Sequence, residues 1–145
     1  MAQELFNAQQ QQSIVEAIKA AEKNTSGEIQ VHIEKKCKGE VLDRAADVFA
    51  TLKMHKTQLR NAVLFYIAVN DHKFAILGDA GINDVVPANF WESIKDDMES
   101  SFKQGEFTQG LCLGISKAGM QLKQHFPYMS NDKNELSDEL SFGND

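Results

Sequence analysis

The stretch from residue 60 to residue 84, RNAVLFYIAVNDHKFAILGDAGIND, constrains the fold more than any other part of the chain. An apolar run over residues 62–69 breaks at Asn70-Asp71, and a second run over residues 74–77 ends in a Gly-Asp-Ala-Gly turn. An apolar run of this length indicates a strand that is buried on both faces. The connection between the two runs is so short that it allows only an antiparallel hairpin. We therefore predict a central strand with an antiparallel neighbour.

The flanking patterns extend this hairpin into a mixed sheet. Residues 28–34 alternate strictly between apolar and polar side chains, which predicts a strand with one buried face, so that His32 on the other face should be solvated. A helical stripe over residues 42–52 joins this strand to the central one, so the two strands should be parallel with a right-handed crossover. Three further helices are predicted: one after the N-cap Asn7, one with Pro87 in its first turn, and one after Gly105. The sequence therefore predicts an α/β fold in a single domain over residues 1–127.

Composition narrows the class of protein. The net charge of −6 argues against nonspecific nucleic-acid binding, which depends on clustered Lys and Arg. No window approaches the ~20 apolar residues of a membrane helix, and the N-terminus does not resemble a signal peptide, so we expect a cytoplasmic protein, monomeric by default. Residues 128–145 are polar, acidic and aperiodic, which predicts a disordered acidic tail. Of the two cysteines, Cys37 between lysines is expected to be an exposed free thiol and Cys112 a core residue.

Strand directions gather oxygen-bearing residues at one end of the predicted sheet. The first two strands should begin there and the third should end there, which brings together the segments around Glu28, Arg60-Asn61 and residues 78–84. The candidate metal ligands at this end are Glu28, Asp79, Asn83 and Asp84. Carboxylate and amide oxygens without His or Cys favour a hard cation, Ca²⁺ before Mg²⁺. The alternative is that Asp79 and Asn83 form turns and that Asp84 caps a helix.

The opposite end of the sheet offers a second acidic locus. Asp71 in the hairpin should lie near Asp43 at the start of the second helix, at an end of the sheet where ligands often bind. The alternative is that Asn70-Asp71 only forms the hairpin turn. The sequence contains no GxSxG, CxxC or HExxH motif, so it identifies no catalytic residues.

The predicted segments, in this order, resemble the TPM domain family. The residues that carry the resemblance are Ile14 and Ile18 leading into Thr25-Ser26-Gly27-Glu28-Ile29, then Ala46 with Phe49, residues 61–64, residues 71–73, Gly78, Gly81-Ile82, and Phe107 with Gly110. The resemblance implies an α/β/α sandwich with a mixed, four-stranded sheet and helices on both faces. Many bacterial members are secreted or membrane-anchored, and because this sequence lacks both signals we expect a cytoplasmic bacterial-type member. It also implies calcium or other divalent-ion binding for some members and acid phosphatase activity for plant members. This chain has Asp79 where the family often has an aromatic residue, and Asn83 where it often has an acid.

Three functions follow as hypotheses. The first is a calcium-binding TPM domain with a regulatory or interaction role. The second is an acid phosphatase acting on phosphomonoesters. The third is a metal-free structural adaptor that binds another protein through the acidic tail or the polar strand face.

Overall fold

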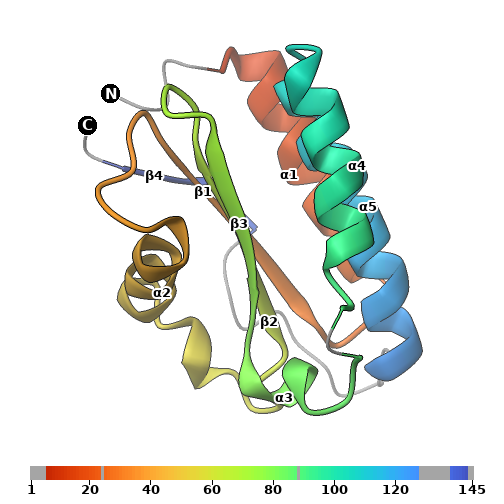
Figure 1. Cartoon of the computed structure of the whole chain (residues 1–145). Coiled ribbons are helices and arrows are strands. Elements are labelled where there is room, and N and C mark those ends of the chain that lie inside the picture. Colours follow the sequence, from red (N-terminus) through yellow and green to blue (C-terminus); the bar gives the residue numbers. More distant parts are fainter. Residues whose placement is uncertain (1–5, 24, 88, 128–137, 144–145) are drawn as a thin grey trace.

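The chain folds as three layers in a computed structural model, which describes residues 6–23, 25–87, 89–127 and 138–143. A four-stranded sheet forms the middle layer. Helix α2 (Val41–Thr51) covers one face, and α1 (Ala8–Glu22), α4 (Glu92–Lys103) and α5 (Phe107–His125) cover the other (Figure 1). The predicted α/β/α sandwich with helices on both faces is confirmed.

The sheet has the strand order β3-β2-β1-β4. Its strands are β1 (Glu28–Glu34), β2 (Ala62–Ala68), β3 (Lys73–Gly78) and β4 (Ser141–Phe142). β1 is parallel to β2 and to β4, whereas β3 runs antiparallel to β2. Glu28 lies opposite Ala62, and Val63 lies opposite Gly78, so β1 and β2 begin at the end of the sheet where β3 finishes. The predicted strand directions are therefore correct.

Most helix boundaries follow local signals. Asn7 caps α1, and it forms the expected capping box with Gln10. The third predicted helix is present as α4, but its predicted start at Pro87 is wrong, because α4 begins only at Glu92 and the backbone N–H of Phe90 donates to the carbonyl of Pro87. A short helix that the sequence reading missed, α3 (Ala80–Asn83), follows β3, and a single turn of 3-10 helix, η2 (Met54–Lys56), follows α2.

Both faces of β1 are buried, which corrects the prediction of one solvated face. Its three apolar residues face the larger core beneath α1, α4 and α5: Ile29, Val31 and Ile33. The four polar residues that alternate with them are also buried: Glu28, Gln30, His32 and Glu34. His32, expected in solvent, is only 7% exposed. His32 and Glu34 tolerate burial because their side chains meet hydrogen-bonding partners in the fold, as described below.

The C-terminal segment also differs from its prediction where the structure describes it. Ser141–Phe142 forms β4, whose residues lie opposite His32 and Ile33, and Gly143 N–H donates to the Ile33 carbonyl over 2.8 Å. Residues 128–137 and 144–145, the rest of the predicted tail, lie outside the described residues. Within the described ranges no helix is long and apolar enough to cross a membrane.

Both cysteines are free thiols, and their burial reverses the expected order. Cys37 is buried at 7% exposure, because it packs into the smaller core under α2. Cys112, expected in the core, is only partly buried on α5. The lysines on either side of Cys37 are exposed, but they do not bring its thiol into solvent.

Candidate functional site

The end of the sheet that holds Glu28 also holds an ion pair between Arg60 and Asp79. The Arg60 fork donates from Nε to Asp79 Oδ2 over 2.7 Å and from Nη2 to Oδ1 over 2.8 Å. Asp79 Oδ1 also accepts from the Ala80 backbone N–H over 2.8 Å, which caps α3. Both carboxylate oxygens are thus engaged, and the guanidinium holds the place beside Asp79 that a cation would take.

The other predicted ligands at this end serve the turn after β3. Asn83 Nδ2 donates to the Gly78 carbonyl over 3.0 Å, and Asp84 is an exposed residue at the C-cap of α3. These are the contacts expected if Asn83 forms the turn.

Gly81 allows the chain before β2 to lie directly against α3. A Cβ atom at position 81 would lie 2.6 Å from the carbonyl oxygen of Arg60 and still closer to that of Leu59. Both obstacles are backbone atoms, which cannot rotate away. The close approach therefore holds Arg60 next to Asp79, and it requires glycine at position 81.

A second group of acidic side chains gathers around the start of β1. Glu28 is 2% exposed, and the end of α1 brings Glu22 to the strand edge, where its Oε2 accepts from Ile29 N–H over 2.8 Å. The C-terminal segment adds Asp138, which hydrogen-bonds to the Glu22 side chain. Burial, the hydrogen bond with Asp138 and the negative charges of Asp138 and Glu28 raise the pKa of Glu22 to about 9. Glu22 therefore keeps a proton at neutral pH.

Sequence reasoning found Glu28 but missed its two acidic neighbours. Glu22 lies at the end of an amphipathic helix, where a carboxylate has no distinctive spacing. Asp138 is 110 positions from Glu28 in the sequence and falls in the segment that was expected to be disordered. In the part of the chain that the structure describes, no three His, Cys, Asp or Glu side chains are arranged to hold a metal ion as they stand.

A buried polar network under α2 centres on Glu34. Its carboxylate accepts from Tyr66 Oη over 2.5 Å, from Arg44 Nε over 3.1 Å and also from Arg44 Nη2, and it lies 3.1 Å from His32 Nε2. The other imidazole nitrogen of His32 lies 2.8 Å from Ser141 Oγ in β4. Burial alone would raise the pKa of Glu34, but the hydrogen bonds from Arg44, Tyr66 and His32 outweigh it and lower the pKa to about 2.

The hairpin end holds Asp71, the remaining predicted ligand. Its Oδ2 accepts from the Cys37 backbone N–H over 2.7 Å, which fastens the hairpin to the loop after β1. Among the described residues, no hydrogen bond or ion pair joins Asp71 to Asp43, the partner proposed for it from the sequence. Asp71 thus acts as a local tie between the hairpin and the loop after β1.

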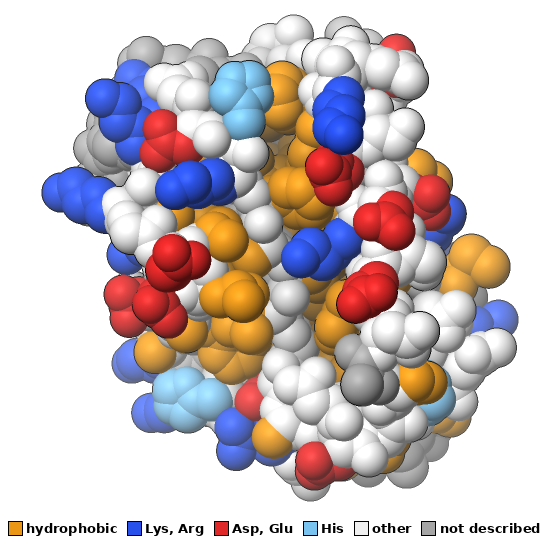
Figure 2. All heavy atoms as spheres, viewed as in Figure 1, with side chains coloured by type: hydrophobic (Ala, Val, Ile, Leu, Met, Phe, Trp, Pro, Cys, Tyr) orange, Lys and Arg blue, Asp and Glu red, His pale blue; other side chains and the backbone are white. Residues whose placement is uncertain are grey.

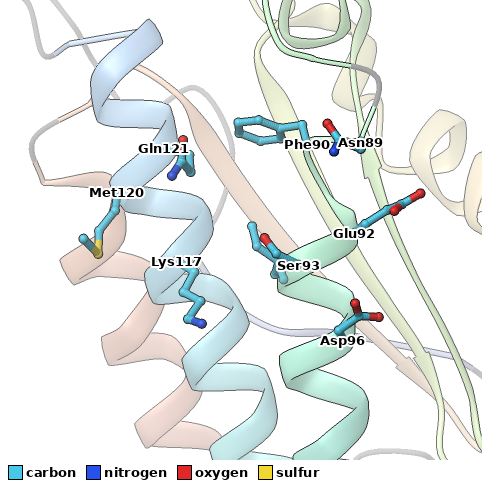
Figure 3. A pocket seen from close by; sticks show the side chains of 9 residues that line it. Asn89, Phe90, Glu92, Ser93, Asp96, Lys117, Met120 and Gln121 are labelled. Atoms are coloured by element: carbon cyan, nitrogen blue, oxygen red, sulfur yellow. The ribbon is translucent and has the colours of Figure 1, made fainter.

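Two hollows on the surface lie away from these acidic groups. The larger, of about 700 Å³, opens between α4 and α5 and is lined by Asn89, Phe90, Glu92, Ser93, Ile94, Asp96, Lys117, Met120 and Gln121. Figure 3 shows that its polar side chains splay apart and do not converge on one point. The second, of about 420 Å³, lies beside the hairpin. Neither contains Glu28 or Asp79.

Comparison with known proteins places these features in a family. Residues 2–121 match the model of the TPM domain, TPM_phosphatase. The fold is similar to the NMR structure of the BA42 protein from the psychrophilic bacterium Bizionia argentinensis, with a TM-score of 0.90, 51% sequence identity and 95% of each chain covered. No curated protein matches the chain. The family match spans most of the chain, and we conclude that this chain belongs to the TPM domain family.

Proposed function

We propose that this chain is a TPM domain that binds a divalent cation, Ca²⁺ before Mg²⁺, in a regulatory or interaction role. The observation that carries the proposal is the meeting of Glu22, Glu28 and Asp138 at the start of β1. Carboxylate oxygens are the ligands that hard cations prefer. Because these ligands come from three separate segments, the site favours Ca²⁺, which accepts irregular geometry, over Mg²⁺, which demands an octahedron.

The raised pKa of Glu22 supports this choice of ligands. A partly buried carboxyl beside other acids keeps a proton because its negative form would be repelled. A cation relieves the same repulsion, so cation binding and proton binding at Glu22 exclude each other. The group therefore fits a cation chemically, although the carboxylates must move closer together to hold one.

The position of Asp138 suggests the regulatory role. Asp138 lies three residues before β4, and it contacts a side chain at the end of α1. A cation held between Asp138 and Glu28 would fasten the C-terminal segment to the edge of β1. Cation binding would thus control how firmly the C-terminal segment covers the edge of β1. If the segment left this edge, the edge could pair with another chain.

Thermal unfolding with and without Ca²⁺ tests the proposal. With Ca²⁺ at one hundred times its Kd, the free energy of unfolding of the natural protein should rise by about 2.7 kcal/mol. Glu22→Gln should abolish this rise, because an amide carries no charge for the cation. Glu16→Gln, the same change at an exposed position on α1, is the control and should retain the rise. An equal rise in Glu22→Gln would refute the site.

Without Ca²⁺, Glu22→Gln should stabilise the protein. Between pH 4.5 and about 9, the folded protein holds a proton on Glu22 that the unfolded chain releases, so stability falls as pH increases through this range. Glu22→Gln lacks this penalty. In a chelating buffer at pH 8 it should be more stable than the natural protein by more than about 1 kcal/mol. A Tm at pH 8 that is unchanged or lower in the variant would contradict the assignment.

Variants of Asp79 and Asp71, which the sequence also predicted as ligands, provide a second comparison for the calcium test. If Asp79→Asn or Asp71→Asn removes the calcium response while Glu22→Gln retains it, the ion binds at the ion pair with Arg60 or at the hairpin. The site at Glu28 predicts that both variants keep the response.

Acid phosphatase activity on phosphomonoesters is the second candidate, and the name of the matching family model favours it. The Arg60 side chain is 50% exposed, so its guanidinium is accessible to a phosphate. Hydrolysis of p-nitrophenyl phosphate, with and without added Ca²⁺ or Mg²⁺, tests the activity. Under this candidate, Arg60→Gln should remove most of the hydrolysis and the exposed control Lys123→Gln should not. Activity that survives Arg60→Gln would rule out this role for Arg60.

The metal-free adaptor is the third candidate. It predicts a protein partner that binds equally well with Ca²⁺ and in a chelating buffer.

A further inference from the structure

An apolar hollow lies beside the β2–β3 hairpin, on the face shown in Figure 2. This hollow, the hairpin pocket, has a volume of about 420 Å³ and lies between the hairpin, the start of α2, α4 and the start of α5. Its walls include Val69, Phe74, Phe102 and Phe107. Phe74 meets Phe102 edge to face with ring centroids 5.0 Å apart, and Phe107 lies 5.4 Å from Phe102. These aromatic contacts fix the shape of the walls.

The rim of the hairpin pocket is positively charged. Lys73, Lys95 and Lys103 are exposed and lie among its lining residues, with Glu99 as the acid between them. Glu99 forms only a loose pair with Lys103, over 3.5 Å. In Figure 2, apolar side chains line a hollow between α2 and α4, with Lys and Arg side chains interspersed with Asp and Glu beside it. The whole chain has a net charge of −6, so the charge of this rim is opposite in sign to that of the chain.

The residue at the mouth of the pocket, His72, has an unusual backbone conformation. His72 ends the hairpin loop with φ at 55°, in the left-handed region where glycine is favoured. A side chain in this conformation costs about 1–2 kcal/mol. His72 is exposed and belongs to the pocket lining, so its imidazole lies at the mouth of the pocket rather than in the core.

We propose that the hairpin pocket binds a free amphipathic carboxylate, such as a medium-chain fatty acid. The apolar tail lies among Phe74, Phe102 and Phe107, and the carboxylate head meets the lysines at the rim. Pockets for small ligands combine mainly apolar walls with a few convergent polar groups, and they start at about 300 Å³. This site is separate from the proposed cation site, and it is tested in a chelating buffer so that failure of one does not affect the other.

Titration with decanoate below its micelle concentration, followed by amide NMR shifts, tests the proposal. We expect saturable shifts around Val69, Phe74 and Phe107. Lys95→Gln/Lys103→Gln should weaken binding about fivefold to tenfold, because two exposed charge pairs are lost. Lys123→Gln, at an exposed position on α5 outside the pocket, should leave the affinity unchanged. Equal affinity in the double variant and the natural protein would overturn the proposal.

Two further arms separate the alternatives. Decanol has the same tail without the charge, and it should bind at least about fivefold more weakly than decanoate. His72→Gly relieves the backbone strain, so it should fold at least as well as the natural protein but bind decanoate more weakly. Equal binding of decanol and decanoate, or undiminished binding by His72→Gly, would contradict the assigned recognition. Binding to anionic phosphatidylglycerol vesicles without binding to monomeric decanoate would assign the pocket to a lipid surface and overturn the proposal.

Discussion

Glu34→Ala is expected to lower the free energy of unfolding by about 3–5 kcal/mol, because it leaves a partly buried charge without its partner. The Glu34 carboxylate accepts hydrogen bonds from both Arg44 and Tyr66 and contacts His32, and it is 4% exposed. Removing it leaves the Arg44 guanidinium and the Tyr66 hydroxyl beneath α2 without their acceptor. Urea denaturation at pH 7 measures the loss.

Two variants show whether the effect comes from the network. Tyr66→Phe removes one donor and keeps the ion pair, so it should cost only about 1–2 kcal/mol. Glu16→Ala removes an exposed carboxylate from α1 and should change stability by less than about 0.5 kcal/mol. If Glu34→Ala costs no more than Glu16→Ala, the network does not stabilise the fold.

The same network should make the stability of the fold decrease at low pH. Because the pKa of Glu34 is about 2 in the folded protein, below the ordinary glutamate value of 4.5, its contribution is present above pH 4.5 and is lost as pH falls toward 2. The natural protein should lose stability through this window more steeply than Glu34→Gln. Parallel pH dependences of Tm for the two proteins would contradict the lowered pKa.

Gly81→Ala is expected to cost about 3 kcal/mol or more, since the added methyl group would overlap backbone atoms. The new Cβ would meet the carbonyls of Leu59 and Arg60, so either α3 or the chain before β2 must move. Movement there would also separate Arg60 from Asp79. Gly39→Ala is the control, because φ is +78° there and nothing lies within 4 Å of the added Cβ. It should cost only about 1–2 kcal/mol from backbone strain. Equal losses in the two variants would show that the close approach is not rigid.

Features carried by local patterns were predictable from the sequence. The apolar run before Asn70-Asp71 and the short turn define the hairpin, and the helix between the first two strands requires them to be parallel. These two statements were enough to bring Arg60 and Asp79 to one end of the sheet. The Asn7 cap was found because its chemistry involves only a neighbour three residues away.

Features that depend on long-range pairing were not predictable. The alternation in β1 indicates polar residues on one face, and it contains no information that Arg44 on α2 and Tyr66 on β2 bury that face with Glu34. Asp138 reaches Glu22 only because β4 docks on β1, and a two-residue strand has no recognisable pattern. A polar strand face therefore predicts either solvent or a buried network, and only the partners distinguish them.

The number of protons released when Ca²⁺ binds at pH 7.5 tests the proposed cation site most directly. It is obtained by calorimetric titration in two buffers of different ionisation enthalpy. Because Glu22 holds a proton at this pH, the natural protein should release about one proton for each Ca²⁺ bound, and Glu22→Gln should release none. Calcium binding without proton release, at an affinity that Glu22→Gln leaves unchanged, would place the ion elsewhere and contradict the site at Glu22, Glu28 and Asp138.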